Sequence, residues 1–511
     1  MSLIRLRKTI SVVILIAFVL LFLGPPIVNT FLSGLLLPLQ LLPAILRIIA
    51  QPEALFIAGI LFVVLITLIF GRVYCSFLCP LGALQDLLIA QSRTFGGRPG
   101  HSFSRPQDGL RYSFLGLTVL ALSAGFLSLA GLLDPYSLAG RLFGHFLQPL
   151  VVWTYNLAIL ALKPFDIYLY PKETAFIPLS VGAVTAGFFL LILYLAATRG
   201  RIYCNTVCPV GTLLGLLSRA SRMQFILDQK ACSACVQCEK VCKAGCIDSQ
   251  SATLDMSRCI GCFNCVHACS KGAIRYQWKP RPMNPASSWM PARRGFIIGG
   301  IAAAAGLLAY MADIRVFANA ASAQADPPVT PPGAISTARF TGACTACSLC
   351  VSVCPTQVLT PTFLDYGVSG LLQPKMNYEK SFCDYECNLC GNVCPTGAIK
   401  PLGLDDKKLT QIGEAELLED ICVVYVDHQN CGACGEVCPT HAIRFVEKRN
   451  ILYPEIDKQY CIGCGACQLA CPTSPRSIIV HAKPVHEKAE KYVGTETPVE
   501  TRKTPDKDFP F

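Results

Sequence analysis

The chain has few charged residues and lacks the attachment motif of c-type haem. Charged residues make up 15% of its 511 residues, hydrophobic residues make up 52%, and the mean hydropathy is +0.47. This composition excludes an ordinary soluble protein and indicates membrane spans. No C-x-x-C-H motif is present, so covalent haem is not expected. Flavin and nucleotide signatures are also absent, since Gly299-Gly300 is followed by an alanine run and not by a phosphate loop.

Basic residues exceed acidic ones, and the formal net charge is +11. Such a balance raises the question of nucleic-acid binding. The Lys and Arg residues instead lie beside the apolar segments, which is the pattern that membrane topology requires. We therefore expect membrane lipid, and no nucleic acid, among the partners.

Four apolar segments before residue 221 predict transmembrane helices at residues 9–30, 54–70, 112–132 and 177–197. Arginines follow the second and fourth segments, so both of those ends are predicted to be cytoplasmic. The first segment follows Arg5, Arg7 and Lys8 and resembles a signal peptide. It ends in Gly24-Pro25-Pro26 without a small-residue cleavage site, which favours a retained helix.

An internal repeat organises this part of the chain. The motif at residues 71–82 recurs at residues 200–211, and each copy contains C-x3-C-P. Each copy ends a unit of two predicted spans separated by an apolar stretch, at residues 31–50 and 142–162, which is interfacial or re-entrant. Residues 1–221 are therefore predicted to form a membrane domain built from a duplicated two-helix unit.

The remaining chain divides into four segments. Residues 222–280 are predicted to form a cytoplasmic ferredoxin domain with two clusters. Residues 281–333 contain Arg293-Arg294 before a Gly/Ala-rich apolar run and then a Pro-rich linker, which predicts a twin-arginine-like signal or a fifth span. Residues 334–482 are predicted to form a periplasmic four-cluster domain, and residues 483–511 a disordered tail.

The 29 cysteines occur mostly in tight runs of four. Neighbours this close are poor disulfide partners for each other. The spacing C-x2-C-x2-C-x3-C-P is that of bacterial ferredoxins, in which three thiolates hold one [4Fe–4S] cubane and the fourth cysteine ligates the other cubane of the pair. A zinc site would show two C-x2-C pairs separated by a longer loop, which does not describe these runs. We expect six [4Fe–4S] clusters and an α+β bacterial-ferredoxin-like fold for both polyferredoxin domains.

In residues 222–280 the two runs cross over in the manner of two-cluster ferredoxins. Lys243 and Ser270 replace the usual prolines, and Cys246 is left over, either as a small buried residue or as a competitor of Cys242. The predicted ligand sets are Cys232, Cys235, Cys238 and Cys269 for the first cluster, and Cys259, Cys262, Cys265 and Cys242 for the second.

The membrane repeats contribute four more cysteines, Cys75, Cys79, Cys204 and Cys208, at the cytoplasmic ends of the second and fourth predicted spans. If the repeats pack by pseudo-symmetry, the four thiols converge. They then form a further metal or cluster site or a redox-active thiol pair. The alternative is that each motif is only a helix-terminal turn whose proline opens the next helix.

The motif at residues 74–85, the second C-x3-C-P and the two ferredoxin runs resemble NapH-type membrane ferredoxin proteins, the MauN type and the membrane part of nitrous-oxide-reductase accessory proteins. Residues 290–482 resemble the NapG/MauM type of periplasmic four-cluster ferredoxin, through Arg293-Arg294 and four further cysteine runs. The chain thus looks like a fusion of the two. In those families the pair acts as a quinol dehydrogenase module that feeds a periplasmic reductase.

By analogy with four-cluster proteins, the first run of residues 334–482 is paired with the fourth and the second with the third. The second and third runs are stretched before their second cysteine, at Cys383 and Cys422. The resulting predicted sets are Cys344, Cys347, Cys350 and Cys471; Cys461, Cys464, Cys467 and Cys354; Cys383, Cys387, Cys390 and Cys438; and Cys422, Cys431, Cys434 and Cys394.

These patterns predict a multi-pass protein of the bacterial inner membrane that carries electrons, with iron held by the cysteines. The resemblance implies quinol, specifically menaquinol, as the donor and a periplasmic cytochrome or reductase as the acceptor. Two alternatives stay open: the protein could donate electrons for the maturation of a periplasmic metalloenzyme, or it could conduct electrons from the cytoplasm to the periplasm.

Overall fold

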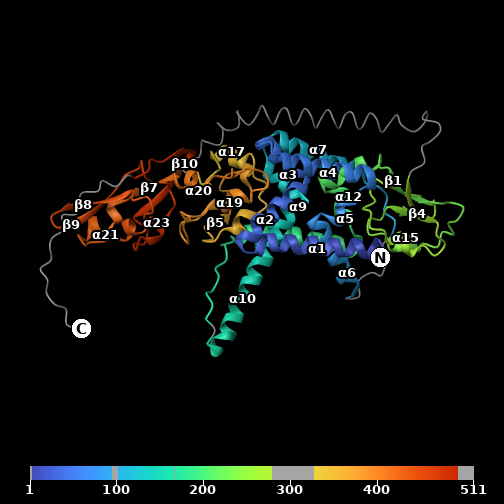
Figure 1. Ribbon diagram of the computed structural model, residues 1–511, viewed down its shortest axis with the longest axis horizontal. Helices are drawn as coiled ribbons and strands as arrows, with labels where there is room; N and C mark the ends of the chain where they lie inside the picture. The colour runs from blue at the N-terminus through green and yellow to red at the C-terminus, as the bar shows by residue number, and fades with distance from the viewer. Residues whose placement is uncertain (1–2, 95–101, 167, 279–326, 493–511) are drawn as a thin grey trace.

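The computed structural model describes residues 3–94, 102–166, 168–278 and 327–492 (Figure 1). The predicted twin-arginine-like segment with Arg293 and Arg294, the predicted fifth span and most of the predicted tail lie outside these residues. The described chain forms a helical membrane part with one ferredoxin-type domain at each end (Figure 1).

Four helices connect the two ends of the membrane part: α1 (Leu3–Leu23), α4 (Ala54–Phe70), α7 (Asp108–Ser123) and α11 (Leu179–Arg199). Their apolar side chains suit a lipid environment, and the helical backbone satisfies its own polar groups, as that environment requires. Of the described helices, α1, α11 and the combined segment Pro135–Leu162 are long and apolar enough to cross a membrane; a bent pair raises the number to four. The span predicted at residues 112–132 is divided, because α7 ends at Ser123 and α8 (Leu127–Leu133) follows.

The connections between these helices are helical and bent. In the first unit, α2 (Pro26–Leu36), η1 (Leu37–Leu39) and α3 (Leu41–Ala50) form a pair bent by 98°, which is a broken span or a re-entrant loop. In the second unit, α9 (Pro135–Leu142), η2 (Phe143–Leu147), α10 (Gln148–Leu162) and η3 (Lys163–Phe165) follow α8, and α10 projects from the body (Figure 1). The first stretch agrees with the expected re-entrant or interfacial segment, whereas the second, predicted at residues 142–162, is part of a segment long and apolar enough to cross a membrane.

Each repeat motif folds as a short helix followed by a proline-initiated helix. These are α5 (Tyr74–Phe77) and α6 (Pro80–Thr94) in the first copy, and α12 (Ile202–Thr206) and α13 (Pro209–Ser218) in the second. Proline suits the first helical position, since it has no N–H to leave unpaired and its φ is already helical. The C-x3-C-P cysteines are therefore held on tight helix–turn–helix corners.

The first ferredoxin-type domain packs on the ends of α4 and α13. Strand β1 (Met223–Leu227) pairs antiparallel with β4 (Ile274–Trp278), and β2 (Ile247–Asp248) pairs with β3 (Thr253–Leu254). Helices α14 (Gln237–Lys240) and α15 (Asn264–Ala268) each lie within a cysteine run. The Tyr276 hydroxyl donates to the carbonyl of Phe70 at 3.0 Å, which joins this domain to α4.

The second ferredoxin-type domain contains three two-stranded antiparallel sheets, β5–β6, β7–β10 and β8–β9. Its strands are β5 (Leu359–Pro361), β6 (Pro374–Met376), β7 (Thr410–Leu417), β8 (Ile443–Lys448), β9 (Ile451–Ile456) and β10 (Ile478–Lys488). Its helices are α17 (Thr337–Thr341), α18 (Leu349–Val353), η5 (Val368–Gly370), α19 (Leu389–Asn392), α20 (Leu404–Lys408), η6 (Glu419–Ile421), α21 (Val423–Val426), α22 (Ala433–Glu436) and α23 (Ala466–Ala470).

The residue range predicted for this domain, 334–482, is too short at both ends. On the N-terminal side, Val329 is buried and its carbonyl accepts a hydrogen bond from the Met376 amide at 2.9 Å, so part of the predicted linker belongs to the domain. On the C-terminal side, β10 continues to Lys488, where Glu487 pairs with Gln411. Residues 483–488 thus form the end of β10 and are not part of a tail, because this part of the strand pairs with β7.

Candidate functional site

The cysteines are grouped around cavities and not around single ions. Among the residues that the structure describes, no group of three or more His, Cys, Asp or Glu is arranged to hold one metal ion. A cubane places its four ligating sulfurs farther apart than the ligands of a single zinc ion, because the iron–sulfur core lies between them. The arrangement therefore fits clusters better than zinc.

In the first ferredoxin-type domain, the cysteines form an outer and an inner group. In the outer group, burial raises the pKa of Cys238, and the nearby thiols of Cys232 and Cys269 raise it further. The Ala273 amide donates to the Cys269 sulfur at 3.2 Å, and Cys235 is exposed. The inner group surrounds a cavity whose lining includes five cysteines, Cys242, Cys246, Cys259, Cys262 and Cys265.

Cys246 lies inside this inner group. Its sulfur is 3.6 Å from that of Cys242, and Cys259 is also within electrostatic reach. The two readings that the sequence left open, a small packing residue and a competing ligand, are both compatible with this position. Because Cys242 follows α14 as the fourth member of its run, its place beside the second run has the crossed geometry of two-cluster ferredoxins.

In the second domain, the fourth cysteines join different partners from those predicted. Cys394 lies beside the first run, where it acts electrostatically on Cys344, Cys347 and Cys350. Cys354 lies in turn beside the second run, next to Cys383, Cys387 and Cys390. The first run is therefore grouped with the second, and the predicted grouping of the first with the fourth is wrong.

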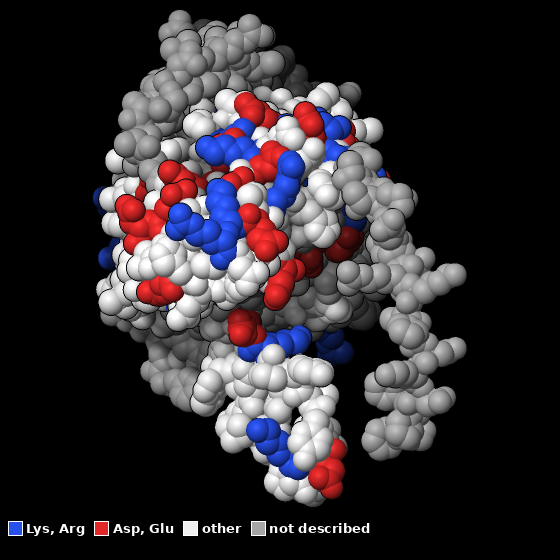
Figure 2. Space-filling model, turned by 90° about the vertical axis from the view of Figure 1, so that its left-hand side faces the viewer, with Lys and Arg blue, Asp and Glu red and all other residues white. Residues whose placement is uncertain are grey.

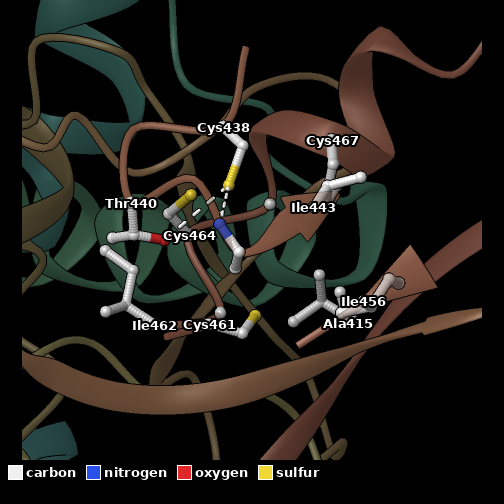
Figure 3. Close-up of a pocket in the computed structure, with 13 residues that line it drawn as sticks. Ala415, Cys438, Thr440, Ile443, Ile456, Cys461, Ile462, Cys464 and Cys467 are labelled. Atoms are coloured by element: carbon white, nitrogen blue, oxygen red, sulfur yellow. Dashed lines mark hydrogen bonds between the residues drawn. The ribbon is translucent and has the colours of Figure 1, made fainter. Parts of the chain in front are cut away.

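The third and fourth runs are grouped with each other. Cys438 and the first three cysteines of the fourth run line one cavity, and Figure 3 shows Cys438 close to Cys464, with Cys461 on the other side. Cys471 lines a second cavity together with Cys422, Cys431 and Cys434. Cys383 and Cys422, the residues before the stretched spacings, thus lie within their own groups.

A shared turn follows the fourth cysteine of every run in this domain. Each of these cysteines is followed by Pro-Thr, and each threonine hydroxyl lies 3.2–3.8 Å from the cysteine sulfur. Because the turn is the same in all four runs, it does not by itself choose the partner run. The packing of runs that are adjacent in sequence makes that choice.

The four C-x3-C-P cysteines converge in the membrane part. Electrostatic interactions link Cys79 to Cys75 and Cys204, and link Cys208 to the other three. All four are 3–5% exposed. The Gly82 amide donates to Cys79 at 3.4 Å, and the Gly211 amide donates to Cys208 at 3.3 Å. The two repeats thus present their thiols to a common centre in the same way.

Two arginines cross between the repeats at this centre. Arg72 of the first repeat donates to the Cys204 carbonyl at 3.1 Å, and Arg201 of the second donates to the Cys75 carbonyl at 2.6 Å. An added Cβ at Gly82 or Gly211 would lie 2.2–2.3 Å from the corresponding cysteine carbonyl, so only glycine permits this approach. The pseudo-symmetry that the repeated motif suggested is therefore present in the structure.

A buried carboxylate accompanies Arg201. Asp86 accepts charge-assisted hydrogen bonds from Arg7 at 2.6 Å and from Arg201 at 3.0 Å, and the Lys243 ammonium lies 2.9 Å away. Burial by itself would raise the pKa of Asp86, but Arg201, Lys243 and Arg7 together lower it well below its ordinary value. Asp86 therefore stays ionised and joins α1, α6, the second repeat and the first ferredoxin-type domain.

The first C-x3-C-P corner contacts the first ferredoxin-type domain beside its inner cysteine group. The Ser76 hydroxyl donates to the Gly261 carbonyl at 3.4 Å, beside Cys262, and Arg72 donates to the Ser257 carbonyl at 2.9 Å. Gly261 packs against Val73. The C-x3-C-P cysteines and the inner cysteine group of the first domain thus lie on opposite sides of this contact between the membrane part and the domain.

On the opposite side, the membrane part holds the first run of the second domain. Arg141 donates to the Ala346 carbonyl at 3.2 Å, a ring nitrogen of His145 lies 2.9 Å from the Ser348 hydroxyl, and Gln148 donates to the Ser352 carbonyl at 3.0 Å. Tyr136 is buried between Asp134 and the thiols of this run. The second domain is therefore docked on the membrane part by buried hydrogen bonds.

Further contacts connect the two halves of the second domain. The Cys383 amide donates to the Cys464 carbonyl at 2.9 Å, and the Tyr378 hydroxyl donates to the Gly463 carbonyl at 2.6 Å. The cysteine groups consequently form a line through the molecule. Sequence reasoning did not single out Arg72, Arg201, Asp86, Arg141 or His145 for a role at these centres, although both arginines stand inside the repeated motif.

Comparison with protein families agrees with this arrangement. A family described as "4Fe-4S binding domain" matches residues 53–98 and 181–227, which contain the two C-x3-C-P motifs. A family described as "4Fe-4S dicluster domain" matches residues 343–398 and 429–474, which contain the first two runs and most of the last two. The chain is a ferredoxin-type electron-transfer protein with 4Fe–4S domains and apolar helices typical of a membrane protein.

Two curated relatives are each similar to about a third of the chain. The chain is 25% identical over 197 residues to the ferredoxin-type protein NapH of Haemophilus influenzae, which is 37% of this chain and 54% of that protein. It is 25% identical over 173 residues to the methylamine utilization ferredoxin-type protein MauN of Methylobacillus flagellatus, which is 34% of this chain and 48% of that protein. The chain thus spans about half the length of these relatives. No solved structure matches it.

Proposed function

We propose that this protein conducts electrons through the membrane along one line of [4Fe–4S] clusters, from quinol to a redox partner on the far side. The observation that carries the proposal is the unbroken series of contacts that joins the cysteine groups. Hydrogen bonds connect the first domain to the C-x3-C-P corners. The second corner is connected to α8 through Tyr203, and α8 is connected to the first run of the second domain through Arg141. Further hydrogen bonds connect the two halves of that domain to each other.

A [4Fe–4S] cluster, when bound, accepts and donates one electron at a time. The chain supplies the thiolates, the apolar enclosure and the amide donors to sulfur that tune each site. The cavities enclosed by cysteines fit such a group. The proposed six ligand sets are Cys232, Cys235, Cys238 and Cys269; Cys259, Cys262, Cys265 and Cys242; Cys344, Cys347, Cys350 and Cys394; Cys383, Cys387, Cys390 and Cys354; Cys461, Cys464, Cys467 and Cys438; and Cys422, Cys431, Cys434 and Cys471.

The C-x3-C-P thiols are proposed to hold a seventh cluster. Cys75, Cys79, Cys204 and Cys208 come from two repeats that fold alike, and they occupy the gap between the two ferredoxin-type domains. A helix-terminal turn alone does not require four buried thiols to converge. Without a cofactor here, the line would be interrupted at the membrane part.

The donor and the acceptor are inferred from the resemblance. We propose menaquinol as donor, a periplasmic cytochrome or reductase as acceptor, and a natural fusion of NapH/MauN-type and NapG/MauM-type proteins with its C-terminal domain in the periplasm. The side chains of Val426 and Val437 in that domain are exposed. Charges of both signs alternate on the end face (Figure 2), so a small apolar contact, and not one sign of charge, would select the acceptor.

A second candidate function is transfer between a soluble cytoplasmic carrier and the periplasm. It is favoured by the first ferredoxin-type domain, whose outer group includes the exposed Cys235 at the end of the line. A donor that enters only from the membrane does not need this outer group. The same line of clusters would then carry electrons over its whole length.

The two functions can be separated by mixing anaerobically purified protein in detergent with a menaquinol analogue and recording reduced-cluster EPR signals. We expect prompt reduction by the quinol, lost in Cys75→Ser or Cys204→Ser and retained in Cys246→Ser. Reduction only by a low-potential ferredoxin, with no response to quinol, would support the second function. Reduction of all clusters at an unchanged rate in Cys75→Ser and Cys204→Ser would overturn the role of the membrane centre.

A further inference from the structure

The converging thiols of the C-x3-C-P motifs are accompanied by two fully buried guanidinium groups. Arg72 is 1% exposed and Arg201 is 0% exposed. A buried cation is costly unless an anion or several hydrogen-bond acceptors compensate it. The two arginines occupy equivalent positions in the two repeats, but their compensation differs.

Arg72 has no carboxylate partner in the described part of the chain. Its guanidinium donates to the Asn205 side-chain oxygen at 3.0 Å, to the carbonyls of Ser257 and Cys204, and to the Cys75 sulfur at 3.8 Å. The charged groups that favour its cationic form are the thiols of Cys75, Cys204 and Cys208. The positive charge of Arg72 is therefore directed at the cysteine centre.

Arg201 has a carboxylate partner, but it shares that partner. Asp86 lies 2.8 Å from Arg201 and also binds Arg7 and Lys243. One negative charge thus faces three positive ones, which leaves an excess of positive charge next to the four thiols. The Cys75 carbonyl that Arg201 binds belongs to one of these thiol-bearing residues.

A [4Fe–4S] cluster held by four thiolates is negatively charged in both redox states, and reduction adds one more negative charge. Nearby positive charge stabilises the reduced state more than the oxidised state, because Coulomb attraction grows with the charge of the cluster. Hydrogen bonds to the ligands and their carbonyls act in the same direction. Buried arginines at this centre therefore raise its reduction potential.

We propose that Arg72 and Arg201 are positioning and charge-compensating residues that raise the reduction potential of a cluster shared by the two repeats, and that Asp86 opposes them. This inference rests on the proposed seventh cluster. It sets an order of effects: Arg72, which has no carboxylate partner, has the larger influence, and Arg201 a smaller one because Asp86 neutralises part of its charge. Removal of the Asp86 charge acts in the opposite direction.

The test is an EPR-monitored redox titration of full-length protein in detergent. The difference between wild type and Cys75→Ser identifies the signal of the shared cluster. We expect Arg72→Gln to lower its midpoint potential, Arg201→Gln to lower it less, and Asp86→Asn to raise it. Arg72→Lys keeps the charge and should restore most of the wild-type potential. A purely structural role would not produce shifts of opposite sign.

Arg111→Gln is the matched control. Arg111 is 1% exposed and donates to the same Ser257 carbonyl as Arg72, but its hydrogen bonds within the described part of the chain involve no thiol. A shift in Arg111→Gln as large as that in Arg72→Gln would overturn the assignment to Arg72. So would unchanged potentials in Arg72→Gln, Arg201→Gln and Asp86→Asn.

Iron analysis separates the two proposals. If Cys75→Ser and Cys204→Ser contain as much iron as wild type, the seventh cluster itself is absent and the proposed function loses its membrane centre. If those variants lose one cluster while the arginine and aspartate variants keep both their iron and the wild-type potential, only the role of the charges fails. Variants that do not retain iron are replaced by Arg72→Lys and Arg201→Lys, whose potentials should stay close to wild type.

Discussion

Arg201 of the second membrane repeat donates a hydrogen bond to the carbonyl of Cys75 in the first repeat at 2.6 Å. The equivalent arginine of the first repeat makes the reverse contact to Cys204 at 3.1 Å. This exchange ties the two C-x3-C-P corners into one unit, so that neither repeat can form its corner alone. The stability of the centre should consequently depend on residues that permit the exchange.

The close packing at Gly82 gives the first prediction. A Cβ there would lie 2.2 Å from the Cys75 carbonyl and 2.9 Å from Arg201. We expect Gly82→Ala to destabilise the protein by about 1–3 kcal/mol, as overpacking of a tight interior does. It should also reduce iron content. Thermal unfolding and iron analysis would show both. Gly116→Ala in α7, where no atom lies within 4 Å of the added Cβ, is the control and should behave as wild type.

The second prediction concerns the grouping of cysteines in the second domain. Cys394→Ser and Cys344→Ser should remove the same cluster, so the double variant should lose no more iron than either single one. Cys394→Ser combined with Cys422→Ser should lose two clusters. Iron and sulfide analysis of the purified variants measures this. If Cys394→Ser and Cys344→Ser together lose two clusters, while Cys394→Ser and Cys422→Ser together lose one, Cys394 belongs with the third run, as the analogy with four-cluster proteins predicted.

The third prediction concerns the docking of the second domain on the membrane part. Arg141→Gln should leave the carbonyls of Ala346 and Gly131 without a charged donor, at a cost of about 1–3 kcal/mol for buried groups. Amide hydrogen exchange in residues 344–352 should increase. Lys448→Gln, a change in an exposed ion pair far from this contact, should leave exchange there unaltered. If amide exchange in residues 344–352 is equally slow in both variants, contacts other than those of Arg141 hold the domain on the membrane part.

The fourth prediction is a pH dependence of the second domain. Burial lowers the pKa of His486 to about 4, and a ring nitrogen lies 2.8 Å from the Thr330 hydroxyl. The unfolded chain binds a proton below its ordinary pKa of about 6.5, whereas the folded domain does so only near 4. The free energy of unfolding should therefore fall as the pH is lowered from 6.5 to 4, by about 2 kcal/mol or less, and then level off.

Thermal unfolding between pH 7 and pH 4 tests this. In His486→Gln the part of the pH dependence due to this residue should vanish. His428→Gln is the control, since His428 lies on the exposed side of the domain near Tyr453. An identical pH profile for wild type and His486→Gln would contradict the prediction.

Much of the site was readable from the sequence because ligand spacing is a local property. Three cysteines two residues apart wrap one cluster whatever lies elsewhere in the chain, so the first three members of each strict run followed directly from the sequence. The duplicated motif at residues 71–82 and 200–211 likewise predicted two equivalent corners. The bent connection at residues 31–50 was expected from its apolar composition and its place between spans.

The fourth cysteines show where local reasoning ends. Spacing alone allows Cys394 to join any other run, and the analogy used here chose the wrong one. The choice depends on which run packs beside Cys394 in the folded domain, and that is the first run. Both domain boundaries were misplaced for a similar reason: Val329 and Glu487 belong to the domain because distant partners, Met376 and Gln411, satisfy their backbones.

The sequence by itself determined the kind of cofactor, the membrane setting and the duplicated unit, because these follow from residue type, spacing and hydropathy. Only the tertiary structure decided that the four membrane thiols meet at one centre and that cysteine groups line up from one domain to the other. It also placed the charge of Arg72 at that centre, where no carboxylate of the described residues pairs with it. These properties depend on which helices pack together, and packing brings together residues such as Cys75 and Arg201 that no local pattern relates.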